Sequence, residues 1–149
     1  MSQQQLQQLS QELQEIQEQI GALQNNVEGL QNEKSEIDEA VDALETLETG
    51  STVQVPIGGG AYLRATIEDI DEAIVELGAD YAAEFEQDGA VDALESKKEN
   101  VDEHIDEVNE QIAELESESA ELEQQAQQLQ QQAMQQQMQQ LGQEQGLDE

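Results

Sequence analysis

The chain has 149 residues, of which 36 are Asp or Glu and only 4 are Lys or Arg, so its formal net charge at pH 7 is −32. A charge of this size and sign repels nucleic-acid phosphate and anionic lipid, which argues against nucleic-acid and membrane partners. The sequence has no cysteine, and this excludes disulfides, thiolate chemistry and zinc–thiolate sites.

So large a charge opposes compaction, and it is tolerated most easily where molar salt shortens the Debye length to about 3 Å. We therefore expect a halophilic host with a salt-rich cytosol; the alternative is that acidity only keeps a coiled coil soluble. No apolar run approaches the roughly 18 residues of a membrane span, and residues 1–5 do not look like a signal peptide. We expect a soluble, cytoplasmic protein.

Residues 1–49 are predicted to form a coiled-coil helix. Apolar residues recur at heptad a and d positions from Leu6 to Leu44, and only Lys34 interrupts them. A helix from Leu6 to Leu47 would be roughly 63 Å long, too long to pack within a small globule. It must therefore pair with another helix.

Residues 50–88 are predicted to form two β-hairpins, because their apolar residues alternate with period two. Gly58-Gly59-Gly60 and Gly78 supply the tight turns, and Pro56 suits a sheet edge or a bulge. Isolated hairpins are marginal in water, so we expect neighbouring subunits to complete the sheet. The expected oligomerisation residues are Val53, Val55, Ile57, Tyr62, Leu63, Ile67, Val75, Leu77, Tyr81 and Phe85.

Residues 89–130 are predicted to form the second coiled-coil helix, with Asp88 as its N-cap and heptads from Val91 to Leu129. If this helix folds back on the first, antiparallel pairing sets a positions against d positions. The residue numbers of each pair then sum to 135, as for Leu23 with Ile112.

This register places Lys34 and Lys98 in adjacent layers, beside Lys97. We interpret the three as a polar level that fixes the alignment of the helices. Their ammonium groups are expected to reach the flanking carboxylates, which are Glu33, Asp38, Glu95 and Asp102.

The distal end of the pair is expected to be under-packed, because Ser119 and Ala126 face Ile16 and Leu9. Residues 131–149 form a Gln/Met-rich tail, expected to be partly disordered, with an acidic end at Asp148 and Glu149. The tail is either inert or a source of adaptable apolar contacts, which Met suits.

No catalytic constellation is present. His104 is the only histidine, and without a cysteine or a second histidine the chain cannot build a triad or a usual transition-metal site. Gly58-Gly59-Gly60 lacks the Lys-Ser/Thr of a phosphate-binding loop, and Asp69, Asp71 and Glu72 lack the spacing of a calcium loop. We predict that the chain is not an enzyme and uses no metal or cofactor.

The most specific segment is Val55-Pro56-Ile57-Gly58-Gly59-Gly60-Ala61-Tyr62-Leu63, which resembles the Pro-hydrophobic-Gly-x-Gly segment of prefoldin alpha subunits. Ile74-Val75-Glu76-Leu77-Gly78-Ala79-Asp80-Tyr81 is similar to the second-hairpin segment of the same family. Beta-type subunits have one hairpin, so two hairpins favour the alpha type. The acidity points to an archaeal, and specifically haloarchaeal, member.

The resemblance implies an α+β fold in which a long antiparallel two-helix coiled coil carries two inserted β-hairpins that join an oligomeric double β-barrel. It implies a heterohexamer of two alpha and four beta subunits, which captures unfolded polypeptides without ATP and passes them to a group II chaperonin. The chain departs from the family in its acidity and its Gln-rich end.

We expect the tips of the coiled-coil arms to bind non-native proteins weakly, with several arms acting together. The tip residues are Leu6, Leu9, Leu13, Ala126, Leu129, Met134 and Met138. An alternative that the heptads alone would permit is a structural scaffold, a parallel coiled-coil dimer in which Lys34 faces its own copy.

Overall fold

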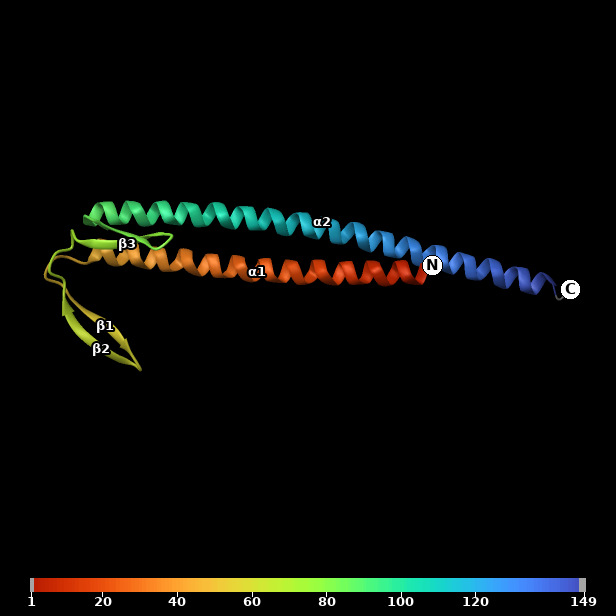
Figure 1. Ribbon diagram of the computed structural model, residues 1–149, viewed down its shortest axis with the longest axis horizontal. Helices are drawn as coiled ribbons and strands as arrows, with labels where there is room; N and C mark the ends of the chain where they lie inside the picture. Colours follow the sequence, from red (N-terminus) through yellow and green to blue (C-terminus); the bar gives the residue numbers. More distant parts are fainter. Residues whose placement is uncertain (1, 148–149) are drawn as a thin grey trace. The chain divides into compact units, whose positions relative to one another are not determined.

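The computed structural model describes the backbone of residues 2–147 and the side chains of residues 3–142. A long helix is followed by two hairpins and a second long helix (Figure 1). This order confirms the predicted α+β fold. The elements are α1 (Ser2–Thr46), β1 (Thr52–Gly58), β2 (Ala61–Thr66), β3 (Ala73–Gly78), β4 (Tyr81–Phe85) and α2 (Gln87–Leu147).

The chain divides into two compact units. The terminal unit comprises Met1–Val27 and Glu107–Glu149, and the central unit comprises Glu28–Asp106. Within each unit, segments of α1 and α2 run antiparallel side by side (Figure 1). Pairing therefore occurs within one chain, and the parallel two-chain scaffold is not the arrangement that the structure shows.

The heptad pattern identifies the contact stripe of both helices. Every predicted a and d position from Leu6 to Leu44, and from Val91 to Leu129, is buried or half-buried. Spacings of three and four residues place these side chains on one face, where they meet the partner helix. The tightest packing in the terminal unit is at Val108, which is 3% exposed.

Ile16 differs from the expectation. We expected it to be under-packed opposite Ser119, but it is buried, with 7% of its surface exposed. In coiled-coil packing a side chain enters a hole formed by four residues of the facing helix, so one small residue opposite does not leave it uncovered. The under-packing therefore does not begin at Ser119.

The two hairpins of the central unit share one construction, repeated twenty residues along the chain. In the first, Val55 pairs with Leu63 and the register shifts between Pro56 and Gly58; in the second, Val75 pairs with Ala83 and the register shifts between Glu76 and Gly78. The expected irregularity beside Pro56 is therefore present.

Both hairpin turns require left-handed backbone. The first uses Gly59 and Gly60, whereas the second uses Ala79 (φ 51°) and Asp80 (φ 63°). Two-residue turns of this kind match the twist of the strands but need positive φ at both central positions. Ala79 pays a conformational cost there that glycine would avoid.

The start of α2 corrects one prediction. Asp88 is not the N-cap: the carbonyl of Glu86 accepts the N–H of Ala90 (2.8 Å), so Glu86 occupies that position. The N–H of Gln87 donates to the carboxylate of Asp71 at 3.2 Å. Asp88 instead lies in the first turn, where its negative charge still complements the helix dipole.

Gln87 also satisfies the end of α1. Its side-chain amide donates to the carbonyls of Leu44 and Leu47, the latter at 3.1 Å. Carbonyls at the C-terminal end of a helix have no partner within the helix, so one side chain here ties the end of α1 to the beginning of α2.

Helix α2 continues without a break through Leu147, so the structure gives the Gln/Met-rich segment as helix up to that residue. Its partial disorder stays a prediction, and Asp148 and Glu149 lie outside the described residues. Across residues 2–147, neither helix has a stretch apolar enough to cross a bilayer.

A crosslink tests the register within the terminal unit. In Leu23→Cys/Ile112→Cys, oxidation is expected to give a disulfide within one chain. The predicted register places the two residues in one layer of the coiled coil, where facing Cα atoms come close to the separation of roughly 7 Å that such a bond can span. Non-reducing gel electrophoresis at low protein concentration would measure it. The control, Leu23→Cys/Ser119→Cys, is one heptad out of register, about 10 Å further along the helix, and should not close. Crosslinks between chains would contradict the register.

Candidate functional site

Two reciprocal ion pairs join α1 to α2 in the central unit. Lys34 Nζ lies 2.7 Å from Asp102 Oδ1, and Lys98 Nζ lies 2.6 Å from Asp38 Oδ1. Each pair takes its lysine from one helix and its aspartate from the other. The expected contacts of the polar level with flanking carboxylates are confirmed for these two lysines, and their role in aligning the helices stays a prediction.

The neighbours of Lys98 in this level change its pKa. The hydrogen bond to Asp38 raises the pKa of Lys98 above its ordinary value of 10.5, and the charges of Asp38, Asp102 and Glu95 act in the same direction. Partial desolvation opposes the shift without cancelling it. A raised lysine pKa means that the charged form is favoured by folding.

The second hairpin lies against the coiled coil of its own unit. The end of β3, at Leu77 and Gly78, borders a groove whose apolar part includes Leu30 and Val101. Lys97, Asn100 and His104 line the polar part of the same groove. His104 is exposed, as expected for a residue on the flank of the helix.

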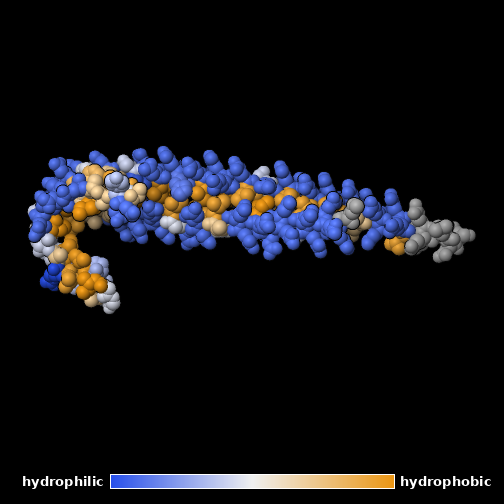
Figure 2. Space-filling view, in the orientation of Figure 1, coloured by the Kyte–Doolittle hydropathy of each residue, from blue (hydrophilic) through white to orange (hydrophobic). Residues whose placement is uncertain are grey.

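The hairpins expose most of the residues predicted for oligomerisation. The exposed set is Val55 (43%), Ile57 (60%), Tyr62 (60%), Leu63 (58%), Leu77 (52%) and Tyr81 (75%). Figure 2 shows this apolar surface on the hairpin formed by β1 and β2, whereas apolar residues of the helices gather along their seam.

Four predicted oligomerisation residues are less accessible. Val53, Ile67 and Phe85 are half-buried, and Val75 is only 5% exposed. Conversely, the prediction missed Ile74, which is 73% exposed. Ile74 pairs with Glu84 on the opposite face of the hairpin from Val75, so the period-two pattern assigned it to a polar face. An apolar, β-branched residue on an otherwise polar face was the feature of the sequence that could have identified Ile74.

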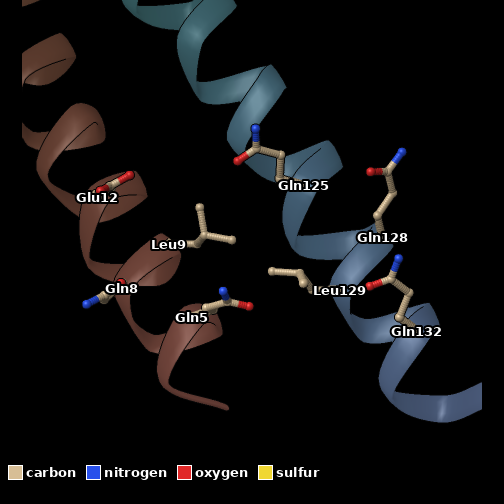
Figure 3. A pocket seen from close by; sticks show the side chains of 8 residues that line it. All are labelled: Gln5, Gln8, Leu9, Glu12, Gln125, Gln128, Leu129 and Gln132. Atoms are coloured by element: carbon tan, nitrogen blue, oxygen red, sulfur yellow. The ribbon is translucent and has the colours of Figure 1, made fainter. Parts of the chain in front are cut away.

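A shallow groove lies at the free end of the terminal unit, between the start of α1 and the later turns of α2. Its volume is about 380 Å³. Leu9 and Leu129 point toward one another across it, and amide side chains surround them (Figure 3). The remaining lining residues are Gln5, Gln8, Glu12, Gln125, Gln128 and Gln132. We call this set the tip groove.

The structure brings the other predicted tip residues to the same end. Leu6, Leu13 and Ala126 are half-buried in the seam. Beyond them α2 continues past the start of α1 and exposes Met134 (68%) and Met138 (75%). Leu141, absent from the predicted set, is also exposed, at 59%. It follows Met134 and Met138 at helical spacing, which was the signal for including it.

Within the described residues, no group of three or more His, Cys, Asp or Glu side chains is placed to hold a metal ion. The arrangement offers apolar surface and polar amides, which suit binding.

Comparison with known proteins gives a consistent result. The family model described as Prefoldin subunit matches residues 16–132. Prefoldin subunit alpha of Halorubrum lacusprofundi is 62% identical over 105 residues, which cover 70% of this chain and 69% of that protein. The chain belongs to the prefoldin family.

Two further matches refine the assignment. Prefoldin subunit alpha of Haloarcula marismortui is 66% identical over 73 residues, which cover 49% of this chain and 47% of that one. A filamentous PFD from Methanocaldococcus jannaschii matches with a TM-score of 0.51 at 24% identity, covering 78% of this chain and 93% of that chain. The structural match concerns the fold, and the two relatives named above are prefoldin alpha subunits from haloarchaea.

The chain is therefore a prefoldin chaperone subunit that resembles the alpha type. The prefoldin family is not an enzyme family, and its subunits form oligomeric complexes with other prefoldin subunits. The haloarchaeal relatives support the halophilic character inferred from the charge of −32.

The Lys98 ion pair predicts a pH dependence. Because folding raises the pKa of Lys98, its contribution to stability is complete below 10.5 and is lost as pH rises through the higher folded-state pKa. In thermal unfolding of this prefoldin subunit, the stability difference between the unmodified chain and Lys98→Met should be constant to about pH 9 and should shift against the unmodified chain as pH rises above 10.5.

The matched control is Lys97→Met, because Lys97 makes no ion pair within the part of the chain that the structure describes. This variant removes one positive charge from the same level and leaves both ion pairs in place. A stability difference between the unmodified chain and Lys98→Met that does not change as pH rises above 10.5 would contradict the assigned role.

Proposed function

We propose that the chain acts in an ATP-independent holdase, binding non-native proteins at the ends of its coiled-coil arms. The observation that carries this proposal is the tip groove, where the leucine pair remains accessible beside exposed methionines on α2. Apolar surface left open at a helix-pair end is suited to the apolar segments that an unfolded chain exposes.

The tip residues support weak and adaptable binding. Methionine is unbranched and has a polarizable thioether, so Met134 and Met138 can follow many client surfaces. One groove of this size gives little affinity alone. Several arms that engage one client raise the effective affinity, and they release it one contact at a time. No nucleotide is needed for either step.

The partners that we propose are four beta subunits together with a second alpha subunit. Each sheet of this chain has only two strands, and its exposed apolar residues need cover. Pairing with neighbouring hairpins would close the sheets into a double β-barrel and remove their open edges. The exposed members of the oligomerisation set predicted from the sequence are the proposed contacts, with Ile74 added to them.

The remaining steps rest on family resemblance. We propose that captured clients pass to a group II chaperonin and that the complex works in the cytoplasm. The chain itself is proposed to have no enzymatic activity and to use no cofactor, since it has no cysteine and a single histidine on an exposed helix flank.

Removal of the tips tests the proposal. Deleting residues 1–9 and 130–149 from the alpha subunit should leave the complex with beta subunits intact, because the hairpins are untouched. The truncated complex is expected to lose most of its ability to suppress aggregation of a denatured client. Light scattering would measure the loss, and sedimentation would verify assembly.

A full-length variant separates tip chemistry from chain length. Met134→Gln/Met138→Gln keeps the helix, since both residues are good helix formers, and removes two apolar contacts. Its matched control is Gln135→Ala/Gln139→Ala on the same segment. Full protection by the truncated complex would exclude the tips as the client site.

A further inference from the structure

The charge of this chain is distributed unevenly. Residues 1–11 and 124–143 contain no Asp, Glu, Lys or Arg, although the chain as a whole carries 36 acidic residues. Glutamine occupies most of the non-apolar positions in both segments. These segments belong to the terminal unit and meet at the tip groove, so the two gaps in the charge pattern coincide in space.

The lining of the tip groove shows the same substitution of amide for carboxylate. Five of its residues are Gln and only one, Glu12, is charged. Figure 3 shows the amides placed around Leu9 and Leu129, so that they would lie next to a molecule bound in the groove. A second groove in the same unit, lined by Leu23 and Leu115, carries two carboxylates, from Glu114 and Glu118. Grooves along this coiled coil therefore do not exclude acidic residues in general.

Solubility does not explain why the tip carries glutamine where the rest of both helices more often carries glutamate. Glutamate and glutamine have similar helix propensities, and glutamate is the usual exposed residue elsewhere on both helices. For solubility alone, added acidic residues are the more effective choice. The near-absence of charge at the tip groove, where Glu12 is the one charged lining residue, therefore indicates a constraint from what the tip binds.

We propose that the tip groove carries almost no charge so that it can bind acidic non-native polypeptides. This inference rests on the proposed function and names its substrate class. A net charge of −32 indicates that the chain is adapted to a salt-rich solvent. Polypeptides in the same solvent need an acidic composition for the same reason. Clients of such a chaperone carry many carboxylates between their apolar segments.

Two physical effects favour glutamine against such clients. A carboxylate at the groove would face client carboxylates at contact distance, where a Debye length of about 3 Å in molar salt screens incompletely. A glutamine amide, in addition, can donate hydrogen bonds to a client carboxylate or backbone carbonyl.

The test variant adds charge to the tip without changing its shape, as Gln5→Glu/Gln8→Glu/Gln125→Glu/Gln128→Glu. The matched control adds four charges to exposed positions in the acidic part of α1, as Gln14→Glu/Gln17→Glu/Gln24→Glu/Gln31→Glu. Both alpha variants are assembled with beta subunits, and sedimentation and circular dichroism verify assembly and helix content.

The probe is a permanently unfolded acidic protein, reduced and carboxymethylated, used in two forms. One form keeps its carboxylates, and in the other they are converted to amides, so that the apolar content is the same. Fluorescence anisotropy at about 1 M salt measures the Kd of each form. The tip variant is expected to bind the acidic form about tenfold more weakly than unmodified complex, and the amidated form within about twofold.

The control variant is expected to bind both forms as the unmodified complex does, and raising the salt should reduce the defect of the tip variant. Equal weakening for both client forms, or no weakening for either, would overturn the inference. Concentration-dependent association of complexes through their tips, lost in the tip variant without any client effect, would also overturn it in favour of a second copy as the occupant.

The two proposals fail in different ways. If tip deletion leaves client binding unchanged, the proposed holdase site is wrong. If deletion abolishes binding but added tip charges do not discriminate between the acidic and amidated clients, only the substrate class is wrong.

Discussion

A two-stranded sheet cannot bury the apolar residues on its own faces, and this constraint organises the molecule. Both hairpins are such sheets, and residues such as Ile57 and Tyr81 remain more than half exposed. Exposed apolar surface of this kind costs free energy until it is covered. We therefore propose that the hairpins act as connectors and that the paired helices are arms of a larger assembly.

Within the chain, a narrow apolar stripe holds the helices together and two ion pairs align them. The stripe alone would allow slippage by one heptad, because most of its layers are alike. Lys34 and Lys98 disfavour such slippage, since the observed register pairs them with Asp102 and Asp38 respectively. Apolar packing thus supplies most of the stability, while the polar level supplies specificity of alignment.

The sequence predicted elements with a strong period well. The heptads located every seam position, and strict alternation together with glycine located both hairpins. Errors arose where tertiary context decides. Asp88 was predicted as the N-cap, but Glu86 occupies that position. Ile16 was expected to be under-packed because only one facing residue was considered, whereas four residues form the hole that it enters. Ile74 was missed because it lies on a face of the hairpin that is otherwise polar. The tip groove could not be predicted as a groove from the sequence, because its two halves lie far apart in the chain and come together only in the folded structure.

The central claim is that the hairpins of this chain remain incomplete without other subunits, and its most direct test is the mass of the assembly. Native mass spectrometry at high salt would be recorded for the chain alone and after mixing with beta subunits. The account predicts that the mixture converts to one species containing two copies of this chain and four of its partner. A chain that stays a stable, well-folded monomer in both samples would contradict the account.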